Sequence, residues 1–205
     1  NIMQKAWPFG LSGVFHLIYF QSDIILVKYI IGDEAAGLYN VAFMILVVAL
    51  MFPSVVYQRF LLPKIHRWAN QDKTLFYKVY KQGNLVMLGL GLFGMLLAWW
   101  LAPYGIPILF GEHYQQSIDL FMILALSIPI LFVASSVGAT LVTQEHMKTK
   151  VKLMGLVAIV NILLNVLFIP KYGATGAAVA TVISNLVLVM LFYITANKVV
   201  FVSQN

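Results

Sequence analysis

Residues 83–102, GNLVMLGLGLFGMLLAWWLA, form an uninterrupted stretch without a charged side chain. An α-helix crosses the hydrocarbon core of a bilayer with roughly 20 mostly apolar residues. The whole 205-residue sequence has the same character, with 61% hydrophobic and 10% charged residues and a mean hydropathy of +0.90. A soluble domain of this length could not bury so many apolar side chains, so the sequence predicts an integral membrane protein.

Five further apolar runs have comparable length, and the connections between the runs are short. The runs lie at about residues 7–31, 38–62, 118–142, 151–169 and 174–196. Their apolar residues follow a helical rather than an alternating period, which argues against a β-barrel. We therefore predict an all-α, polytopic membrane protein that consists of one compact unit of six transmembrane helices.

The positive charges gather at one set of alternate helix ends. Only Lys28 and Lys171 lie at the opposite set; the others are Lys5, Arg59, Lys64, Arg67, Lys73, Lys78, Lys81, Lys148, Lys150, Lys152 and Lys198. This distribution follows the positive-inside rule and predicts that both termini are cytoplasmic. It also explains the net charge of +6 without nucleic acid as a partner. The connection at residues 63–83 interleaves lysines with aromatic residues, and we expect it to lie along the membrane surface among lipid head groups.

The sequence offers little for covalent catalysis. It contains no cysteine, which removes disulfides, thiolate metal sites and cysteine nucleophiles. Three of its histidines, His16, His113 and His146, fall in a span, an outer loop and an inner loop, with no HExxH or Ser-His-Asp pattern. We expect a protein that is not an enzyme.

Asp23 is an ionisable residue deep inside the first apolar run. Such a residue costs at least about 2.5 kcal/mol to insert, which makes it a candidate functional residue. Ser12, His16, Tyr19 and Asp23 follow one another at helical spacing and share one face, which must look into protein or water. Lys28 lies about 140° around the helix at 100° per residue and is expected to reach the outer surface rather than to pair with Asp23. The carboxylate either fixes helix packing or serves as a cation site or proton acceptor in a transport pathway.

Polar residues occur in three other runs. Asn161 and Asn165 lie one turn apart on the fifth run, and Thr181 lies on a stripe of small and polar residues in the sixth. Their oxygens suit Na⁺ or a hydrogen-bond network around a protonatable Asp23; alternatively they only hold helices together. Arg59, near the inner end of the second run, either binds a phosphate group or marks the membrane boundary.

Three stretches carry a resemblance to a known family. Residues 144–187, QEHMKTKVKLMGLVAIVNILLNVLFIPKYGATGAAVATVISNLV, resemble the closing part of polysaccharide and O-antigen flippases of the multidrug/oligosaccharidyl-lipid/polysaccharide exporter superfamily. Residues 22–43, SDIILVKYIIGDEAAGLYNVAF, and 109–129, LFGEHYQQSIDLFMILALSIP, are similar to the central helix pair and an outer loop of the same family. Members are similar in having two lobes of six helices. Residues 1–205 resemble the C-terminal lobe alone, so the N-terminal lobe is expected as a missing partner.

The resemblance implies a flippase of the bacterial inner membrane. Its substrates would be undecaprenyl-pyrophosphate-linked oligosaccharide repeat units of O-antigen, capsule or exopolysaccharide, moved from the inner to the outer leaflet by alternating access. Further expected partners are membrane lipids and a polysaccharide polymerase. Candidate residues of the substrate cavity are His16, Tyr19 and Arg59, with Tyr39 as a further aromatic group for sugar recognition.

In the related peptidoglycan-precursor flippases, this lobe assembles a sodium site from polar residues of three helices. The matching positions here are Asp23, Asn161, Asn165 and Thr181, which makes Na⁺ or H⁺ the expected coupling ion and leaves no other cofactor to expect. Asn165 departs from the pattern because an acid stands there in that branch, and its neutrality should weaken Na⁺ binding in favour of proton coupling. The alternatives are a multidrug exporter of the same superfamily and a membrane scaffold that does not transport.

Overall fold

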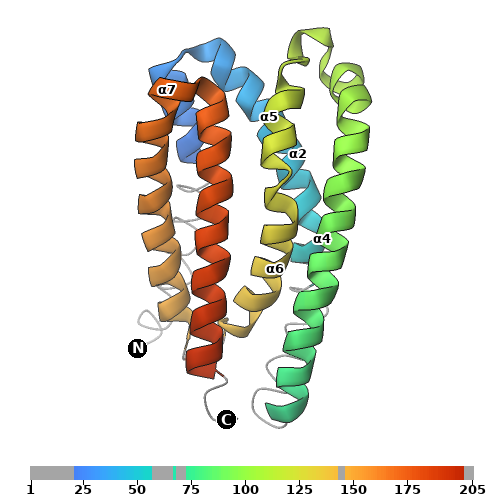
Figure 1. The fold of residues 1–205 in the computed structure, drawn as a ribbon, viewed down its shortest axis with the longest axis vertical. Coiled ribbons are helices and arrows are strands. Elements are labelled where there is room, and N and C mark those ends of the chain that lie inside the picture. The colour runs from blue at the N-terminus through green and yellow to red at the C-terminus, as the bar shows by residue number, and fades with distance from the viewer. Residues whose placement is uncertain (1–20, 57–66, 68–72, 143–145, 201–205) are drawn as a thin grey trace, which may run out of the picture.

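The computed structural model describes residues 21–56, 67, 73–142 and 146–200. Every element in these ranges is helical, and none is a strand (Figure 1). Residues 21–30 form a helical segment that precedes a turn at Ile31. The following elements are α2 (Asp33–Val55), α4 (Lys73–Phe110), the short η2 (Glu112–Tyr114), α5 (Ser117–Leu124), α6 (Ser127–Thr140), α7 (Met147–Thr195) and η3 (Ala196–Val200). The predicted all-α class is confirmed.

The outer surface is that of a membrane protein. Four segments of the described chain are long and apolar enough to cross a membrane, namely Asp33–Val55, Thr74–Phe110, Ser117–Thr140 and Met147–Val200. Large apolar side chains point outward along them, among them Phe93 (66% exposed), Trp100 (68%) and Ile108 (80%). Apolar surface of this extent is unfavourable in water, and we infer that these side chains face lipid.

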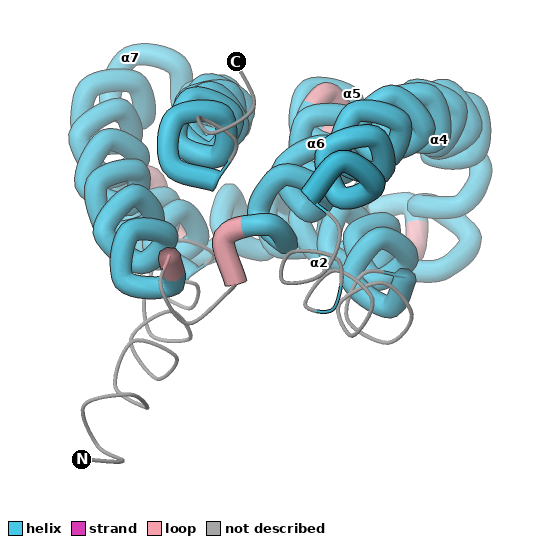
Figure 2. The backbone as a smooth tube through the Cα atoms, turned by 90° about the horizontal axis from the view of Figure 1, so that it is seen from below, coloured by secondary structure: helices cyan, strands magenta, loops and turns pink. Residues whose placement is uncertain are grey.

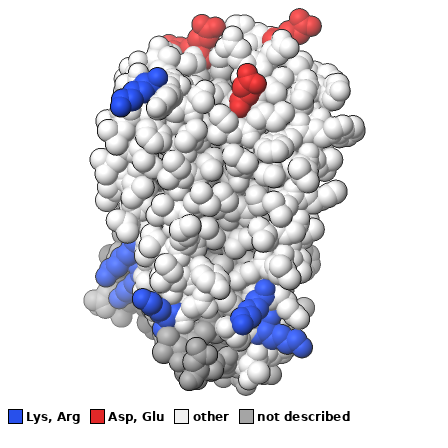
Figure 3. Space-filling view, in the orientation of Figure 1, with Lys and Arg blue, Asp and Glu red and all other residues white. Residues whose placement is uncertain are grey.

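The exposed charged side chains of the described residues lie near the two ends of the molecule. On the face shown in Figure 3, most lysines gather at the lower end and the acidic residues at the upper end, with an uncharged band between them. We name the lower end the basic end; it holds Lys78, Lys81, Lys148, Lys152 and Lys198. The upper end is the acidic end; it holds Asp33, Glu34, Glu112 and Asp119. This segregation agrees with the charge pattern predicted from the sequence.

Helix α7 folds back on itself at Gly173. This residue has φ 65° and ψ −147°, whereas the residues around it are helical. A positive φ is easily reached only by glycine, so Gly173 lets the chain reverse without a loop. The result is two arms, residues 147–172 and 174–195, that lie side by side in Figures 1 and 2. The apolar runs expected at 151–169 and 174–196 correspond to these arms.

The run expected at residues 118–142 is broken into α5 and α6. Pro129, near the start of α6, has no N–H to continue the helical ladder backward. At the break, the N–H of Leu126 bonds to the carbonyl of Ile123 at 3.1 Å, three residues back instead of four. The carbonyl of Met122 instead accepts a hydrogen bond from the indole N–H of Trp99 at 3.0 Å. Helix α4 thus supplies a donor at the position where the broken helix needs one.

We expect Trp99→Phe to destabilise the protein, because it leaves the Met122 carbonyl without its donor inside an apolar region. A lost hydrogen bond of this kind costs about 1–3 kcal/mol. The matched control is Trp100→Phe, since Trp100 is 68% exposed and should tolerate the change. Thermal unfolding in detergent measures both variants, and equal melting temperatures for the two would contradict the assigned role of Trp99.

Helix α4 is longer than the sequence suggested. We expected residues 63–83 to lie along the membrane surface, but residues 73–82 form the beginning of α4, in line with the rest of the helix (Figure 1). A straight helix of its 38 residues would span about 57 Å at 1.5 Å per residue, far more than the roughly 30 Å of a bilayer core; Pro103 and Pro107 lie near its end. The physical reason is packing: Phe76 and Tyr80 are 3% and 4% exposed, so their side chains are buried in protein rather than in lipid.

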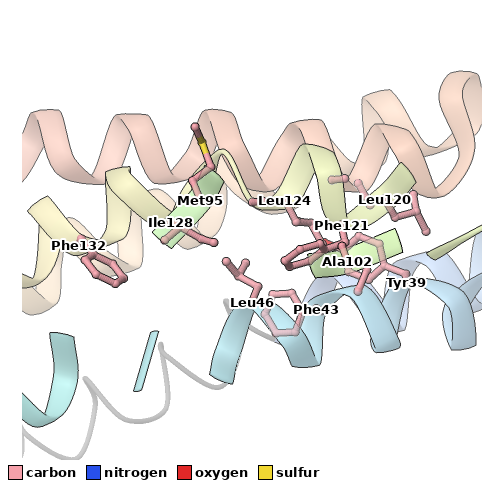
Figure 4. Close-up of a cluster of buried hydrophobic side chains, with 14 of the residues drawn as sticks. Tyr39, Phe43, Leu46, Met95, Ala102, Leu120, Phe121, Leu124, Ile128 and Phe132 are labelled. Atoms are coloured by element: carbon pink, nitrogen blue, oxygen red, sulfur yellow. The ribbon is translucent and has the colours of Figure 1, made fainter. Parts of the chain in front are cut away.

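A cluster of apolar side chains joins α2, α4, α5 and α6 (Figure 4). From α2 come Tyr39, Phe43 and Leu46; their partners are Met95 and Ala102 of α4, Leu120, Phe121 and Leu124 of α5, and Ile128 and Phe132 of α6. The rings of Tyr39 and Phe43 stack with centroids 6.1 Å apart. This core fixes α2, so that Tyr39 is held at the edge of the site described next.

Candidate functional site

Asp23 is a carboxylate buried in the interior of the molecule. It lies on the helical segment 21–30 and is 1% exposed. Its hydrogen-bond partners come from three other places in the chain: α2, the first arm of α7 and the second arm of α7. The site therefore depends on the reversal at Gly173, which brings the two arms of α7 together around one side chain.

Three side chains contact the two oxygens of Asp23. The amide nitrogen of Asn165 donates to Oδ1 at 2.5 Å, and the hydroxyl of Tyr39 donates to Oδ2 at 3.0 Å. The hydroxyl of Thr181 also contacts Oδ2 and lies 3.1 Å from the hydroxyl of Tyr39. All three contacting groups can donate a hydrogen, which is the arrangement that stabilises a charged carboxylate.

Asn161 extends the network by one helical turn. Its Oδ1 accepts hydrogen bonds from the amide nitrogen of Asn165 and from the hydroxyl of Ser22, both at 3.2 Å. Two buried polar atoms of this cluster, Nδ2 of Asn161 and Oδ1 of Asn165, have no partner among the described residues. Buried polar atoms are seldom left unpaired, so the cluster keeps unused hydrogen-bonding capacity for a further polar ligand.

The hydrogen atoms available in the cluster allow two arrangements. The Thr181 hydroxyl lies near Asp23 and also 3.0 Å from the carbonyl of Ala177, but it has one hydrogen to give. With Asp23 charged, that hydrogen goes to the carboxylate. With Asp23 protonated, the carboxyl can donate to Thr181, which then donates to Ala177. The same heavy-atom positions can thus hold either form of Asp23.

The oxygens of the cluster also suit a hard monovalent cation. Carboxylate, amide and hydroxyl oxygens are the ligands that such ions take in proteins, and the unpartnered Oδ1 of Asn165 is an oxygen with a free lone pair. Asp23, Asn161, Asn165 and Thr181 would hold the ion. Asp23 supplies the single negative charge, since its three contacting partners are neutral groups.

The structure brings together the four residues named as the ion or proton site. Asp23, Asn161, Asn165 and Thr181 form one connected, buried network, and their role in coupling stays a prediction. The proposed cavity residues His16, Tyr19 and Arg59 lie outside the described residues.

Two other polar side chains, close to network residues in the sequence, bond to groups outside the network. Lys28 is not a partner of Asp23, as predicted, and pairs with Asp33 at 2.9 Å on the surface. Asn185, which shares the polar stripe of Thr181, donates instead to the hydroxyl of Ser127 at 2.9 Å. That bond links the second arm of α7 to α6.

Two members of the network were not predicted for this site. The resemblance suggests Tyr39 only for sugar recognition, but Tyr39 is 0% exposed and its hydroxyl contacts both Asp23 and Thr181. Ser22, which is adjacent to Asp23 in the sequence, is the second member. Tyr39 lies on a different helix from Asp23, so the residue spacing along one helix could not connect the two. Ser22 is next to Asp23 in the sequence, and this adjacency could have predicted its part in the network.

We expect Tyr39→Phe to weaken the site while keeping its packing, because the ring stays and one donor to the carboxylate is lost. Hydrogen bonds to charged groups contribute about 1.5–3 kcal/mol. Tyr104→Phe is the control, since Tyr104 is 66% exposed. A fall in unfolding temperature for Tyr39→Phe alone supports the contact, and equal stability of both variants argues that the Tyr39 hydroxyl does not bond to Asp23.

Comparisons with known proteins give two matches. A family model described as polysaccharide biosynthesis protein matches residues 1–68, a range that contains Asp23 and Tyr39. The capsular polysaccharide biosynthesis protein CapF of Staphylococcus aureus is 24% identical over 172 residues, which cover 82% of this chain and 43% of that protein. The chain thus spans less than half the length of this relative. No solved structure matches the chain significantly.

Proposed function

We propose that this chain, a relative of the polysaccharide flippases, is half of a transporter that moves lipid-linked oligosaccharides across a bacterial inner membrane. The matching family model and the matching protein are both named for polysaccharide biosynthesis. This supports the resemblance seen in the sequence and connects the chain with polysaccharide synthesis or export. The chemical class of the substrate, a sugar repeat unit on an undecaprenyl-pyrophosphate carrier, is the class that such flippases would move.

The observation that carries a transport mechanism is the buried network around Asp23. A carboxylate buried inside an apolar run is costly, and here it is surrounded by side chains from both arms of α7 and from α2. An ion or proton that binds there changes the contacts between these elements. Because a ligand shifts a conformational equilibrium only by its differential affinity for the two states, binding at Asp23 would drive the lobe toward one of them.

The proposed topology places the basic end in the cytoplasm and the acidic end outside. This topology has six spans, each crossing the membrane once. They are the segment that includes residues 21–30, α2, α4, the broken helix of α5 and α6, and the two arms of α7. Both termini are then cytoplasmic. A second lobe of similar size would complete the central cavity, because the chain covers 43% of its relative.

The protein moves its lipid and leaves the covalent bonds of that lipid unchanged. Supporting this, the two described histidines lie far apart, His113 in η2 at the acidic end and His146 directly before α7 at the basic end.

The proposed function is tested by complementation. The complete gene that encodes this chain is introduced into a strain that lacks its polysaccharide flippase, and surface polysaccharide is measured against an empty vector. Restored surface polymer is the expected result. Failure to restore polymer in the strain that makes the cognate repeat unit, at normal membrane abundance, would contradict the flippase assignment; restored resistance to organic cations instead would favour a multidrug exporter.

A further inference from the structure

Lys150 differs from the two lysines beside it on α7. Lys148 and Lys152 are exposed, whereas Lys150 is partly buried. Residues four apart on a helix share a face, and the residue midway between them lies on the other side. Lys148 and Lys152 therefore point outward at the basic end, and Lys150 points into the space between α6 and the two arms of α7.

The contacts of the Lys150 ammonium are made with neutral groups. Its Nζ donates to the carbonyl oxygen of Gly138 on α6 at 3.2 Å and lies 5.8 Å from the ring centroid of Phe192 on the second arm of α7. A side chain at Gly138 would crowd this place, since a Cβ there would lie 3.1 Å from the Phe192 ring and 3.5 Å from Nζ. Three elements thus meet at one ammonium group.

These contacts leave the positive charge only partly compensated. An ammonium group has three hydrogens, and the carbonyl of Gly138 takes one of them. Within the described ranges of the chain, Lys150 contacts no carboxylate. Capping the C-terminal end of α6 explains the bond to Gly138. It leaves the remaining donors without an anion among the described residues, and an unpaired charge at a partly buried site is costly.

From this geometry we propose that Lys150 is an anion-binding residue whose ligand is a phosphate group presented at the basic end. Phosphate oxygens accept strong, charge-assisted hydrogen bonds from an ammonium group. If the proposed function holds, on which this assignment of the ligand rests, the phosphate is the pyrophosphate of the lipid-linked substrate. The other source of the same chemistry is the head group of an anionic phospholipid.

The first experiment measures the reactivity of individual lysines. The purified full-length protein, in nanodiscs of zwitterionic lipid, is reductively methylated with and without inorganic pyrophosphate, and methylation at each lysine is quantified by mass spectrometry. We expect pyrophosphate to slow methylation of Lys150 in a saturable way and to leave Lys152 unchanged. Equal effects at both lysines, or none at Lys150, would overturn the proposal.

Variants give an independent measurement on the same protein. Pyrophosphate should raise the melting temperature of the wild type by mass action. In Lys150→Gln the concentration needed for half of this rise should increase about tenfold, as for the loss of one charge-assisted hydrogen bond. Lys152→Gln removes the same charge two residues away and should bind as the wild type does. Lys150→Arg keeps the cation and should retain much of the binding, which guards against a glutamine variant that merely fails to fold.

Two further arms identify the source of the anion. In the first, anionic phospholipid replaces the zwitterionic lipid and no pyrophosphate is added. Lys150 is then protected from methylation if a lipid head group is the ligand, and it stays reactive if the ligand is the pyrophosphate of the substrate. Glu145 precedes α7, and Glu145→Gln tests an internal ion pair. If this variant alone changes the reactivity of Lys150 and pyrophosphate does not, the counterion belongs to the chain and the proposal fails. None of these results requires transport, so they are separate from the test of the proposed function.

Discussion

Replacing Asp23 by Asn should strongly reduce transport while the protein still folds and reaches the membrane. Asparagine has nearly the same shape, and its amide oxygen can accept hydrogen bonds from the hydroxyls that now contact Asp23. It cannot carry the negative charge or release a proton. If the coupling ion acts through this charge, surface polysaccharide should fall about tenfold or more, which corresponds to the loss of roughly 1.4 kcal/mol or more of coupling free energy.

The control for this variant is Asp33→Asn. Asp33 is exposed and pairs with Lys28 on the surface at 2.9 Å, and surface ion pairs contribute little to stability. Surface polymer and membrane abundance are measured for both variants in the complemented strain. Wild-type levels of polymer with Asp23→Asn would show that the carboxylate serves helix packing and is not needed for coupling.

Replacing Gly91 by Ala should destabilise the protein, although the change adds a single methyl group. Helix α4 passes so close to α6 at this point that a Cβ on Gly91 would lie 2.5 Å from the Cα of Pro129 and 3.2 Å from the Cβ of Phe132. Because one of these is backbone, the two helices must move apart. Overpacking of this kind costs typically 1–3 kcal/mol, and we expect a value of about 3 kcal/mol here.

Gly89→Ala is the matched control on the same helix. Nothing lies within 4 Å of a Cβ built at Gly89, and alanine is the better helix former by about 1 kcal/mol. The two substitutions should therefore change the unfolding temperature in opposite directions. If both raise it, the close packing of α4 on α6 is not as the structure shows.

The composition of the site could be predicted in part from the sequence. The spacing of Asn161 and Asn165 places them on one helix face, and Asp23 had to face protein because lipid does not solvate a carboxylate. Their meeting with Thr181 was implied by the family resemblance, and the structure shows the contacts. Tyr39 was missed as a partner because its position depends on how α2 packs, which periodicity along one helix does not report.

The ends and breaks of the helices were less predictable. Hydropathy predicts the centre of α4 well, but the first turns of this helix are basic and aromatic. They are helical because Phe76 and Tyr80 are buried, and this burial arises from tertiary packing. The break between α5 and α6 depends on Pro129, whose presence was visible, together with a donor from Trp99 on another helix. Gly173 could be recognised as a turn residue, whereas its φ of 65° is known only from the structure.

The most direct test of a coupling role for Asp23 is transport by the intact protein in proteoliposomes. Outward movement of a lipid-linked oligosaccharide is measured under an imposed Na⁺ gradient, an imposed pH gradient and no gradient, for the wild type and Asp23→Asn. We predict movement by the wild type that one of the two gradients accelerates, and no such acceleration in the variant. Movement that neither gradient changes, or acceleration that persists in Asp23→Asn, would contradict the claim that binding at Asp23 drives the transporter.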